Sequence, residues 1–368
     1  IGFRGYTMAK ITIPQLFTIF LLSTGLNNHV IITPLLLNAS GRDAWISIII
    51  GYLATLLISL PIFYISSHFL NESFISWLST TYSCFLGRMI ATFFVIHLMV
   101  AGWISLRETT YWVNETFLFN TPIIIIAICL LLASLYISYG KLNTIAICAG
   151  VLLPLVILFG VFVAIGTIPD KNYQLVTPIL VENSWSDVWY GALYVLGSNI
   201  EILFIILIQN QISKKVLRRH YILLITFLII LTMGPLLGTI AIFGIEEAKE
   251  LSYPSFFQWR ILGIGTYFNH LDFLSIYQWT SGHLIRLAIF LYLITHVLEI
   301  KKKRMRLYIQ VFICMIYLTF TISSISDEGF VTFLSNYYYA FSCIVGVTMI
   351  IFLTLLVRIS KRRAMIEK

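Results

Sequence analysis

The chain has 368 residues, of which 59% are hydrophobic and 11% are charged, and its mean hydropathy is +0.92. These values exclude an ordinary soluble domain and predict an all-α polytopic membrane protein. The net charge of +8 does not indicate nucleic-acid binding, because the basic residues cluster between apolar stretches rather than on one soluble face.

Ten apolar stretches are long enough to cross a bilayer, which takes about 20 residues of helix. They lie at about 13–37, 44–66, 86–117, 121–139, 142–168, 186–208, 221–244, 272–298, 306–323 and 331–357. We expect one transmembrane domain over 1–368, with a first five-helix repeat at about 13–168 and a second at about 186–357. Ile1 is not a natural start, so Met8 is the expected initiator and Ile1–Thr7 an extension.

The basic residues test this count, since cytoplasmic segments of membrane proteins carry an excess of Lys and Arg. With a cytoplasmic N-terminus, the inside segments hold 18 of the 24 basic residues, and the outside segments hold Arg42, Lys171, Lys249 and Arg260. One miscounted helix would scramble this asymmetry. The pattern therefore predicts that both termini are cytoplasmic.

The first stretch is a spanning helix that we do not expect to remain regular. Its middle carries Gly25, Asn27, Asn28 and His29, and Pro34 follows. Glycine and proline weaken a helix, and polar side chains are costly when they face lipid, so we expect an opened backbone that lines a cavity. The alternative is an ordinary span in which the glycine allows close helix packing.

The sixth stretch carries a second interruption at Gly197, Ser198 and Asn199, a turn-forming triplet at mid-membrane. Interrupted helices at matching positions of two halves are the best sequence pointer to a transporter-type binding site. Because each half has an odd number of helices, the two repeats are expected to have inverted topology.

Two such breaks facing each other would recognise a zwitterion such as a free amino acid. The N-terminus of a half-helix exposes N–H groups that suit a carboxylate, and unwound carbonyls suit an ammonium group. The residues that we expect to contact the ligand in these two spans are Gly25, Leu26, Asn27, Leu196, Gly197, Ser198 and Asn199.

Two further spans offer candidate walls for the cavity. In the eighth, residues at i, i+3, i+4 and i+7 form one face: Tyr277, Thr280, Ser281 and Leu284. Their hydroxyls either line the cavity or bond to their own helix backbone. In the third, Val100 and Ala101 would supply a small apolar wall if the spans converge.

Charges inside membrane spans are expensive and are normally paired or functional. The residues of this kind that stand out are Arg107, Glu108, Glu115, Glu201 and Arg286. We expect structural pairing, with Glu108 or Glu201 as the partner of Arg286. A proton relay through His97, Glu108 or Glu201 is the alternative.

The sequence offers little support for an enzyme. It has no Gly-rich nucleotide loop, no HExxH and no nucleophile elbow, and Ser198 with His283 lacks an orienting signature for an intramembrane protease. The five cysteines show no CxxC spacing, so we expect neither a disulfide framework, nor a metal site, nor a cofactor.

Several runs of residues carry a family resemblance. Gly41–Ser47, which reads GRDAWIS, and Ile11–Gln15 open the second and first spans. Arg107, Glu115 and Thr121-Pro122 follow around the third and fourth, and Tyr253-Pro254-Ser255 precedes the eighth. Together these runs resemble the B subunit of spore germinant receptors, the GerAB-type family, over essentially the whole chain.

The resemblance implies a ten-helix, LeuT-like fold of the amino acid–polyamine–organocation superfamily in the inner membrane of an endospore. Such a subunit works with an A-type and a lipoprotein C-type partner to detect small nutrients. We expect the nutrient at mid-membrane, between helices 1, 3, 6 and 8. The alternative is a secondary transporter of amino acids or another small solute. The polar run Asn27–His29 departs from the family's apolar residues, which points away from a small apolar germinant.

Overall fold

The computed structural model describes residues 10–69, 72–263 and 270–366. Over these residues the chain forms helices and no strand, apart from an isolated parallel pairing of Ile11 with Ile212. Seven of the helical segments described are long and apolar enough to cross a membrane: Ile13–Ser66, Cys84–Thr116, Lys141–Gly166, Trp185–Gln211, Arg218–Glu250, Leu274–Val297 and Asp327–Arg363. The predicted all-α membrane class is confirmed.

The N-terminal part contains α1 (Ile13–Phe20), η1 (Leu21–Gly25), η2 (Asn28–Ile32), α2 (Thr33–Ser40), η3 (Gly41–Asp43), α3 (Ala44–Ser66), α4 (Phe74–Thr81), α5 (Cys84–Thr116), α6 (Ile123–Tyr139), α7 (Lys141–Gly166), η4 (Ile168–Asp170) and η5 (Tyr173–Val176). The C-terminal part contains α8 (Trp185–Asn199), η6 (Ile200–Phe204), α9 (Ile205–Ile208), η7 (Gln209–Gln211), α10 (Arg218–Glu250), α11 (Pro254–Ile261), α12 (Leu274–Val297), α13 (Lys303–Thr321), α14 (Asp327–Phe333), η8 (Leu334–Tyr338) and α15 (Tyr339–Ile366).

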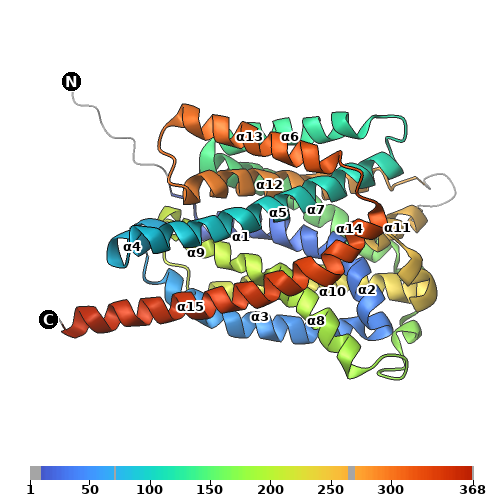
Figure 1. The fold of residues 1–368 in the computed structure, drawn as a ribbon. Helices are drawn as coiled ribbons and strands as arrows, with labels where there is room; N and C mark the ends of the chain where they lie inside the picture. The colour runs from blue at the N-terminus through green and yellow to red at the C-terminus, as the bar shows by residue number, and fades with distance from the viewer. Residues whose placement is uncertain (1–9, 70–71, 264–269, 367–368) are drawn as a thin grey trace.

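The 54-residue segment Ile13–Ser66 folds as two helical parts that pack on each other rather than as one helix. The chain turns at Gly41, whose φ of +52° is a conformation that residues with a side chain rarely adopt. Two helices outside the group of seven, α6 with 17 residues and α13 with 19, pack against each other along one side of the molecule (Figure 1).

The segment Trp185–Gln211 and helix α12 form the buried centre. In the most apolar window of each, 89% and 83% of the residues are buried, against 28% for α7. Helix α12 packs against α5, α6 and α7, and α8 packs against α2, α3 and α15. A helix that is apolar on all sides belongs inside a bundle. A central site must therefore lie where these two segments meet the first span.

The polar middle of the first span predicts an opened backbone, but the structure has a widened helix there instead. Gly25 ends the π-helical turn η1, Leu26 and Asn27 keep right-handed helical dihedrals, and Asn28 begins a second π turn, η2. Pro34 explains part of this geometry. In a π register its nitrogen would bond to the carbonyl of His29, but proline has no N–H. That carbonyl accepts instead from the hydroxyls of Thr33 and Ser255, at 3.0 and 2.9 Å.

The sixth span departs from α-helical geometry later than predicted. Gly197, Ser198 and Asn199 are the last residues of α8, and the irregular part is the 3₁₀ turn η6 at Ile200–Phe204. Short 3₁₀ stretches inside a helix often mark a functional hinge. The interruption is thus a tightened turn that contains Glu201, rather than an unwound loop.

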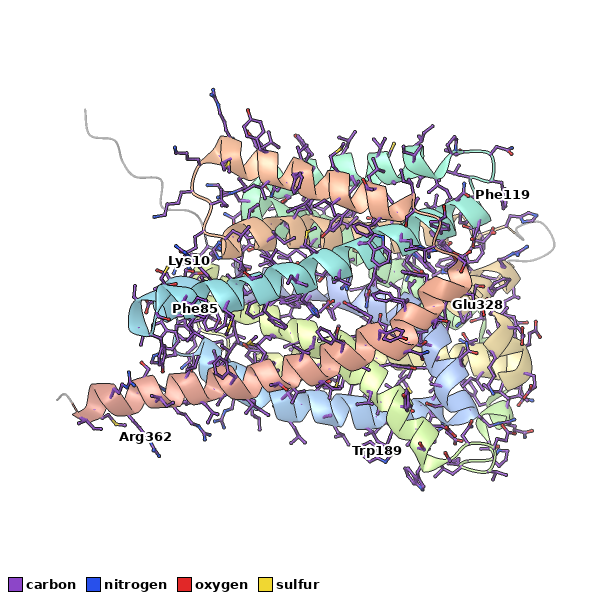
Figure 2. All side chains as sticks on the ribbon, in the orientation of Figure 1. Lys10, Phe85, Phe119, Trp189, Glu328 and Arg362 are labelled. Atoms are coloured by element: carbon purple, nitrogen blue, oxygen red, sulfur yellow. The ribbon has the colours of Figure 1, made fainter. Side chains whose placement is uncertain are left out.

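The two ends of the bundle differ in what covers them. Lys10, Phe85 and Arg362 lie at one end, and Phe119 and Glu328 lie at the other (Figure 2). At the first end α4 packs on α5, and the backbone of Ile11 bonds to Gln211 and Ser213 at 2.9 and 2.8 Å. At the other end α11 covers α10, α2 and η2. The predicted extension Ile1–Thr7, Met8 and part of the loop at 264–269 lie outside the described residues.

Candidate functional site

A buried ion pair joins the sixth and eighth spans at the centre of the molecule. The Nη1 and Nη2 atoms of Arg286 donate to the two carboxylate oxygens of Glu201 at 2.6 and 2.5 Å. Each residue is only 2% exposed. A two-point contact of arginine with carboxylate is the strong form of such a pair, and a charge at this depth requires it. Of the two expected ion-pair partners of Arg286, Glu108 and Glu201, the structure has Glu201.

The first span joins this central ion pair through its π turn. Arg286 Nη1 also donates to the backbone oxygen of Ser23 at 3.1 Å, and the hydroxyl of Thr24 donates to Glu201 at 3.0 Å. A π turn shifts the backbone bonds out of α register, which lets a carbonyl accept from another element. Three spans therefore meet at one charged contact.

Buried asparagines lie one turn further along the first span. Asn28 Nδ2 donates to Asn199 Oδ1 at 2.9 Å, and Asn199 Nδ2 donates to the carbonyl of Val195 at 2.9 Å. The Oδ1 atoms of Asn27 and Asn28 are buried and have no hydrogen-bond partner in the described part of the chain. A buried acceptor left unpaired costs free energy, so these oxygens are candidate acceptors for N–H groups of a ligand.

The molecule is closed around these groups. Two cavities of about 10 Å³ each lie nearby, one bordered by Thr24 and Glu201 and the other by Leu26 and Trp279. Such a volume holds about one water molecule. Typical ligand sites measure about 300 Å³ or more. A ligand of ordinary size can therefore enter only if the helices move.

In this closed state the two glycines of the predicted site allow close packing. A Cβ atom on Gly25 would lie 2.8 Å from the side chain of Leu231, and one on Gly197 would collide with the backbone oxygen of Tyr339. Close packing was the alternative considered for such glycines. Close packing and ligand contact are compatible roles for these glycines, because a tight contact in one state can open in another.

The other residues predicted in these spans are mostly enclosed. Leu26 packs against Gly282 of α12, where a Cβ atom would meet the side chain of Leu26. The hydroxyl of Ser198 donates to a carbonyl of its own helix at 3.1 Å. Ser281 is buried, and Leu196 is half-buried. In this closed state they are packing residues rather than free polar groups.

In the closed state the predicted face of the eighth span bonds to helix backbones, which is the alternative stated for its hydroxyls. Tyr277 donates to the carbonyl of Leu152 on α7 at 3.3 Å, and Thr280 donates to a carbonyl of its own helix at 2.5 Å. The carbonyl of Leu284 accepts from α6. Helical spacing sets this face roughly opposite Arg286, so it does not line the central ion pair.

The third span contributes to a different space. Val100 lines an apolar cavity between α5, α13 and α14, and Ala101 is fully buried. His97 packs between the rings of Phe204 and Tyr338, with centroids 5.6 and 6.2 Å away. These contacts are aromatic packing, and a proton relay through His97 stays a prediction.

A second group of charges lies towards the end of the molecule that carries Glu328. Arg107 pairs with Asp327 at 3.0 Å, and Glu115 accepts from the hydroxyl of Tyr253 at 3.1 Å. Burial and the carboxylates of Glu108 and Glu115 raise the pKa of Tyr253, so this hydroxyl remains a donor. Glu108 forms no ion pair with any described residue. Sequence reasoning missed Asp327 because it lies 220 residues from Arg107.

The sequence profile of the spore germination protein family matches residues 10–329. This chain belongs to the spore germination protein family. Spore germination protein XB of Bacillus anthracis is 36% identical over 332 residues, which make up 90% of this chain and 92% of that protein. The family resemblance predicted from the sequence is confirmed, and the chain is an integral membrane protein of that family.

In this spore germination protein, Arg42 and Asp43 of the run GRDAWIS bind the loop at 175–183 and hold it at the start of the second span. The guanidinium of Arg42 binds the carboxylate of Glu182 at 2.8 and 3.2 Å and also donates to two backbone carbonyls of the loop. The carboxylate of Asp43 accepts from the backbone N–H of Leu180 and from Asn183 at 2.9 and 3.0 Å. We call these contacts the loop clasp. The motif identified the family, but the sequence did not indicate this partner loop.

Proposed function

We propose that the chain is the nutrient-sensing subunit of a spore germinant receptor and binds a small zwitterion, such as an amino acid, at the central ion pair. The observation that carries this proposal is the contact of Arg286 and Glu201 with the π turn at Ser23 and Thr24. Spans 1, 6 and 8 meet there, and span 3 packs against span 8 beside them.

The chemistry of the pair suits a ligand with both charges. A carboxylate can replace Glu201 on the guanidinium of Arg286, and an ammonium group can then bind the released carboxylate. The unpaired oxygens of Asn27 and Asn28 add acceptors beside it. A ligand with only one charge would leave the other buried ion unpaired, which is strongly unfavourable. The site therefore favours zwitterions over simple anions or cations.

Sensing requires two states with different affinities for the nutrient. The described state is closed, with space for about one water molecule beside Glu201 and about one beside Leu26. We propose that the nutrient stabilises a more open state in which Gly25 and Gly197 separate from α10 and α15. The hinge of that movement would be formed by η1 and η6, where the helices already depart from α geometry.

The proposed architecture has ten spans in two inverted repeats, at about 13–168 and 186–357, as in LeuT-like folds. It counts Ile13–Ser66 as two spans and adds α6 and α13 to the other six long segments. The position of Lys10 and Arg362 at one end of the molecule supports an even number of spans (Figure 2). We place this end on the cytoplasmic side of the endospore inner membrane, with A-type and lipoprotein C-type subunits as partners.

A secondary transporter is the alternative function, because irregular turns in two central spans are also what alternating access uses. Purified protein in sealed vesicles, given radiolabelled amino acids with and without a proton or sodium gradient, separates the two. Saturable binding without uptake supports the sensor, and accumulation driven by the gradient supports the transporter.

The same assay tests the site. Glu201→Gln should abolish binding, and Tyr221→Phe is the matched control, since it removes another buried hydrogen bond, that of Tyr221 to Ser66 at 3.0 Å. If Glu201→Gln binds the amino acid as well as Tyr221→Phe does, the central ion pair is not the site.

A further inference from the structure

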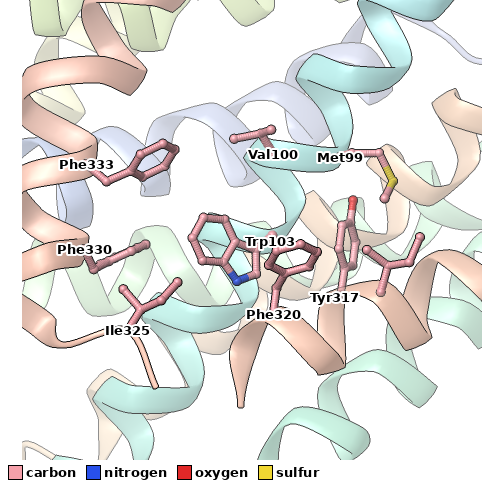
Figure 3. A pocket seen from close by; sticks show the side chains of 9 residues that line it. Met99, Val100, Trp103, Tyr317, Phe320, Ile325, Phe330 and Phe333 are labelled. Carbon is pink, nitrogen blue, oxygen red and sulfur yellow. The ribbon is translucent and has the colours of Figure 1, made fainter. Parts of the chain in front are cut away.

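We infer that an apolar groove between α5, α13 and α14 binds the acyl chain of a membrane lipid. The groove encloses about 420 Å³, far more than the space at the central ion pair. Figure 3 shows its walls, formed by Met99, Val100 and Trp103 of α5, Tyr317 and Phe320 of α13, and Phe330 of α14. The inference rests on the proposed architecture, in which α13 crosses the membrane, and not on nutrient binding at the central ion pair.

The lining offers a ligand mainly hydrocarbon contact, and its one unpaired polar group is the buried indole N–H of Trp103, which has no partner among the described residues. The only hydroxyl in the wall, that of Tyr317, donates to the backbone oxygen of Leu98 at 3.2 Å. The absence of a Cβ atom at Gly102 lets this hydroxyl approach α5 so closely. One free donor cannot hold a buried water molecule, which needs about two to four polar partners, so the cavity stays dry and accepts apolar molecules.

Aromatic rings keep the groove from closing. Trp103 contacts Phe320, Phe330 and Phe333 with ring centroids 6.1, 5.8 and 5.8 Å away. Phe330 is fixed from behind, since the guanidinium of Arg107 lies 4.1 Å from its ring centroid. An empty apolar space loses dispersion contacts along its walls, and a hydrocarbon chain restores them.

The occupant we assign is a lipid because the groove continues the surface that faces the bilayer. Phe320 at its edge is 53% exposed, and Phe312 and Met315 on the same helix are 66% and 60% exposed. Lipid chains cover this surface of a spanning helix, so an acyl chain can enter from the side.

The nearby charges favour a whole lipid over a free fatty acid. Arg107 is the cation beside the groove, and its guanidinium is already bound by Asp327 at 3.0 Å and by the backbone oxygen of Ile325 at 2.8 Å. A fatty acid would bring a carboxylate to a cation whose charge Asp327 already pairs, and only the buried Nε of Arg107 lacks a partner among the described residues. A phospholipid keeps its headgroup at the bilayer surface and sends only hydrocarbon inside.

Photo-crosslinking of the full chain in nanodiscs tests the inference. The probe is a phosphatidylcholine with a diazirine on its acyl chain, and labelled peptides are mapped by mass spectrometry. We expect labelling at Met99–Trp103 and at 320–333 to exceed several-fold the labelling around Leu57, a reference residue on α3 that is 68% exposed. Labelling of the groove no stronger than at Leu57 would overturn the inference.

Two variants fill the space in different ways. Val100→Trp fills the interior, and Ile325→Trp narrows the mouth, where Ile325 is 36% exposed. Each folded variant should lose groove labelling several-fold and keep the labelling at Leu57. Unchanged groove labelling in either variant contradicts the inference. So does stronger labelling by a photoreactive free fatty acid, or a second copy of the chain covering the groove, detected as a dimer by native mass spectrometry.

Discussion

Removing the charge of Glu201 should destabilise the protein more than any other conservative change at the centre. Glu201→Gln keeps the size of the side chain and an oxygen that can accept from Arg286, but it leaves the guanidinium, 2% exposed, without a counter-charge. Breaking a buried pair by removing one partner costs about 3–5 kcal/mol. Since 1.4 kcal/mol is a factor of ten, the ratio of folded to unfolded protein should fall by roughly 10²- to 4 × 10³-fold.

The double variant Glu201→Leu with Arg286→Met separates charge from packing. A buried pair replaced by apolar residues of similar volume is often neutral or stabilising by about 1–4 kcal/mol. We therefore expect the double variant to regain the stability that the single one loses, while nutrient binding stays absent. The measurement is reversible unfolding in mixed micelles, followed by tryptophan fluorescence and analysed as a double-mutant cycle.

Two results would refute this reasoning. If Glu201→Gln costs less than about 1 kcal/mol, as exposed pairs do, the pair is hydrated and its burial in the structure is not that of the working protein. If the double variant is no more stable than the single ones, packing rather than charge holds the three spans together.

Three further predictions follow from individual contacts. Gly197→Leu should lose about 1–3 kcal/mol of stability and the nutrient response, because the new side chain meets the backbone of Tyr339. Gly150→Leu should keep both, because the space around Gly150 is open. Thermal unfolding measures the stability, and spore germination measures the response. Arg42→Lys should release the loop clasp, since lysine cannot make the two-point contact with Glu182. Proteolysis at 168–184 should then be faster. An unchanged rate of proteolysis would show that the clasp does not hold the loop. In four variants, a single cysteine replaces Lys171, Lys249, Lys215 or Lys302. A membrane-impermeant thiol reagent added outside should label the variants at Lys171 and Lys249 but not those at Lys215 and Lys302. Equal labelling of all four contradicts the ten-span topology.

The sequence predicts the helical membrane class better than it predicts the local geometry of the first and sixth spans. Apolar length is a property of each segment alone, so the spans could be read directly. Whether Gly25 and its neighbours unwind or form a π turn depends on donors elsewhere in the chain. The carbonyl of Ser23 is bonded by Arg286, 263 residues away, and that of His29 by Ser255, 226 residues away. No local pattern contains these partners.

The charges show the same limit. The cost of burial predicts that Arg286 must have a partner, but not which one, because the choice depends on which helix faces align. The stripe that begins at Tyr277 is ambiguous in the sequence for a related reason. A polar face inside a membrane is equally compatible with a cavity and with hydroxyls that bond to their own or a neighbouring helix, as Thr280 and Tyr277 do.

The pairing of Ile11 with Ile212 gives the molecule a built-in reporter of opening. It ties the start of the first span to the segment that follows the sixth, through the N–H of Ile11 and the N–H of Ser213. These spans cannot separate at that end while both bonds are intact. The rate at which the two amide protons exchange with deuterium therefore measures how often the two spans separate at this end, and the measurement needs no ligand.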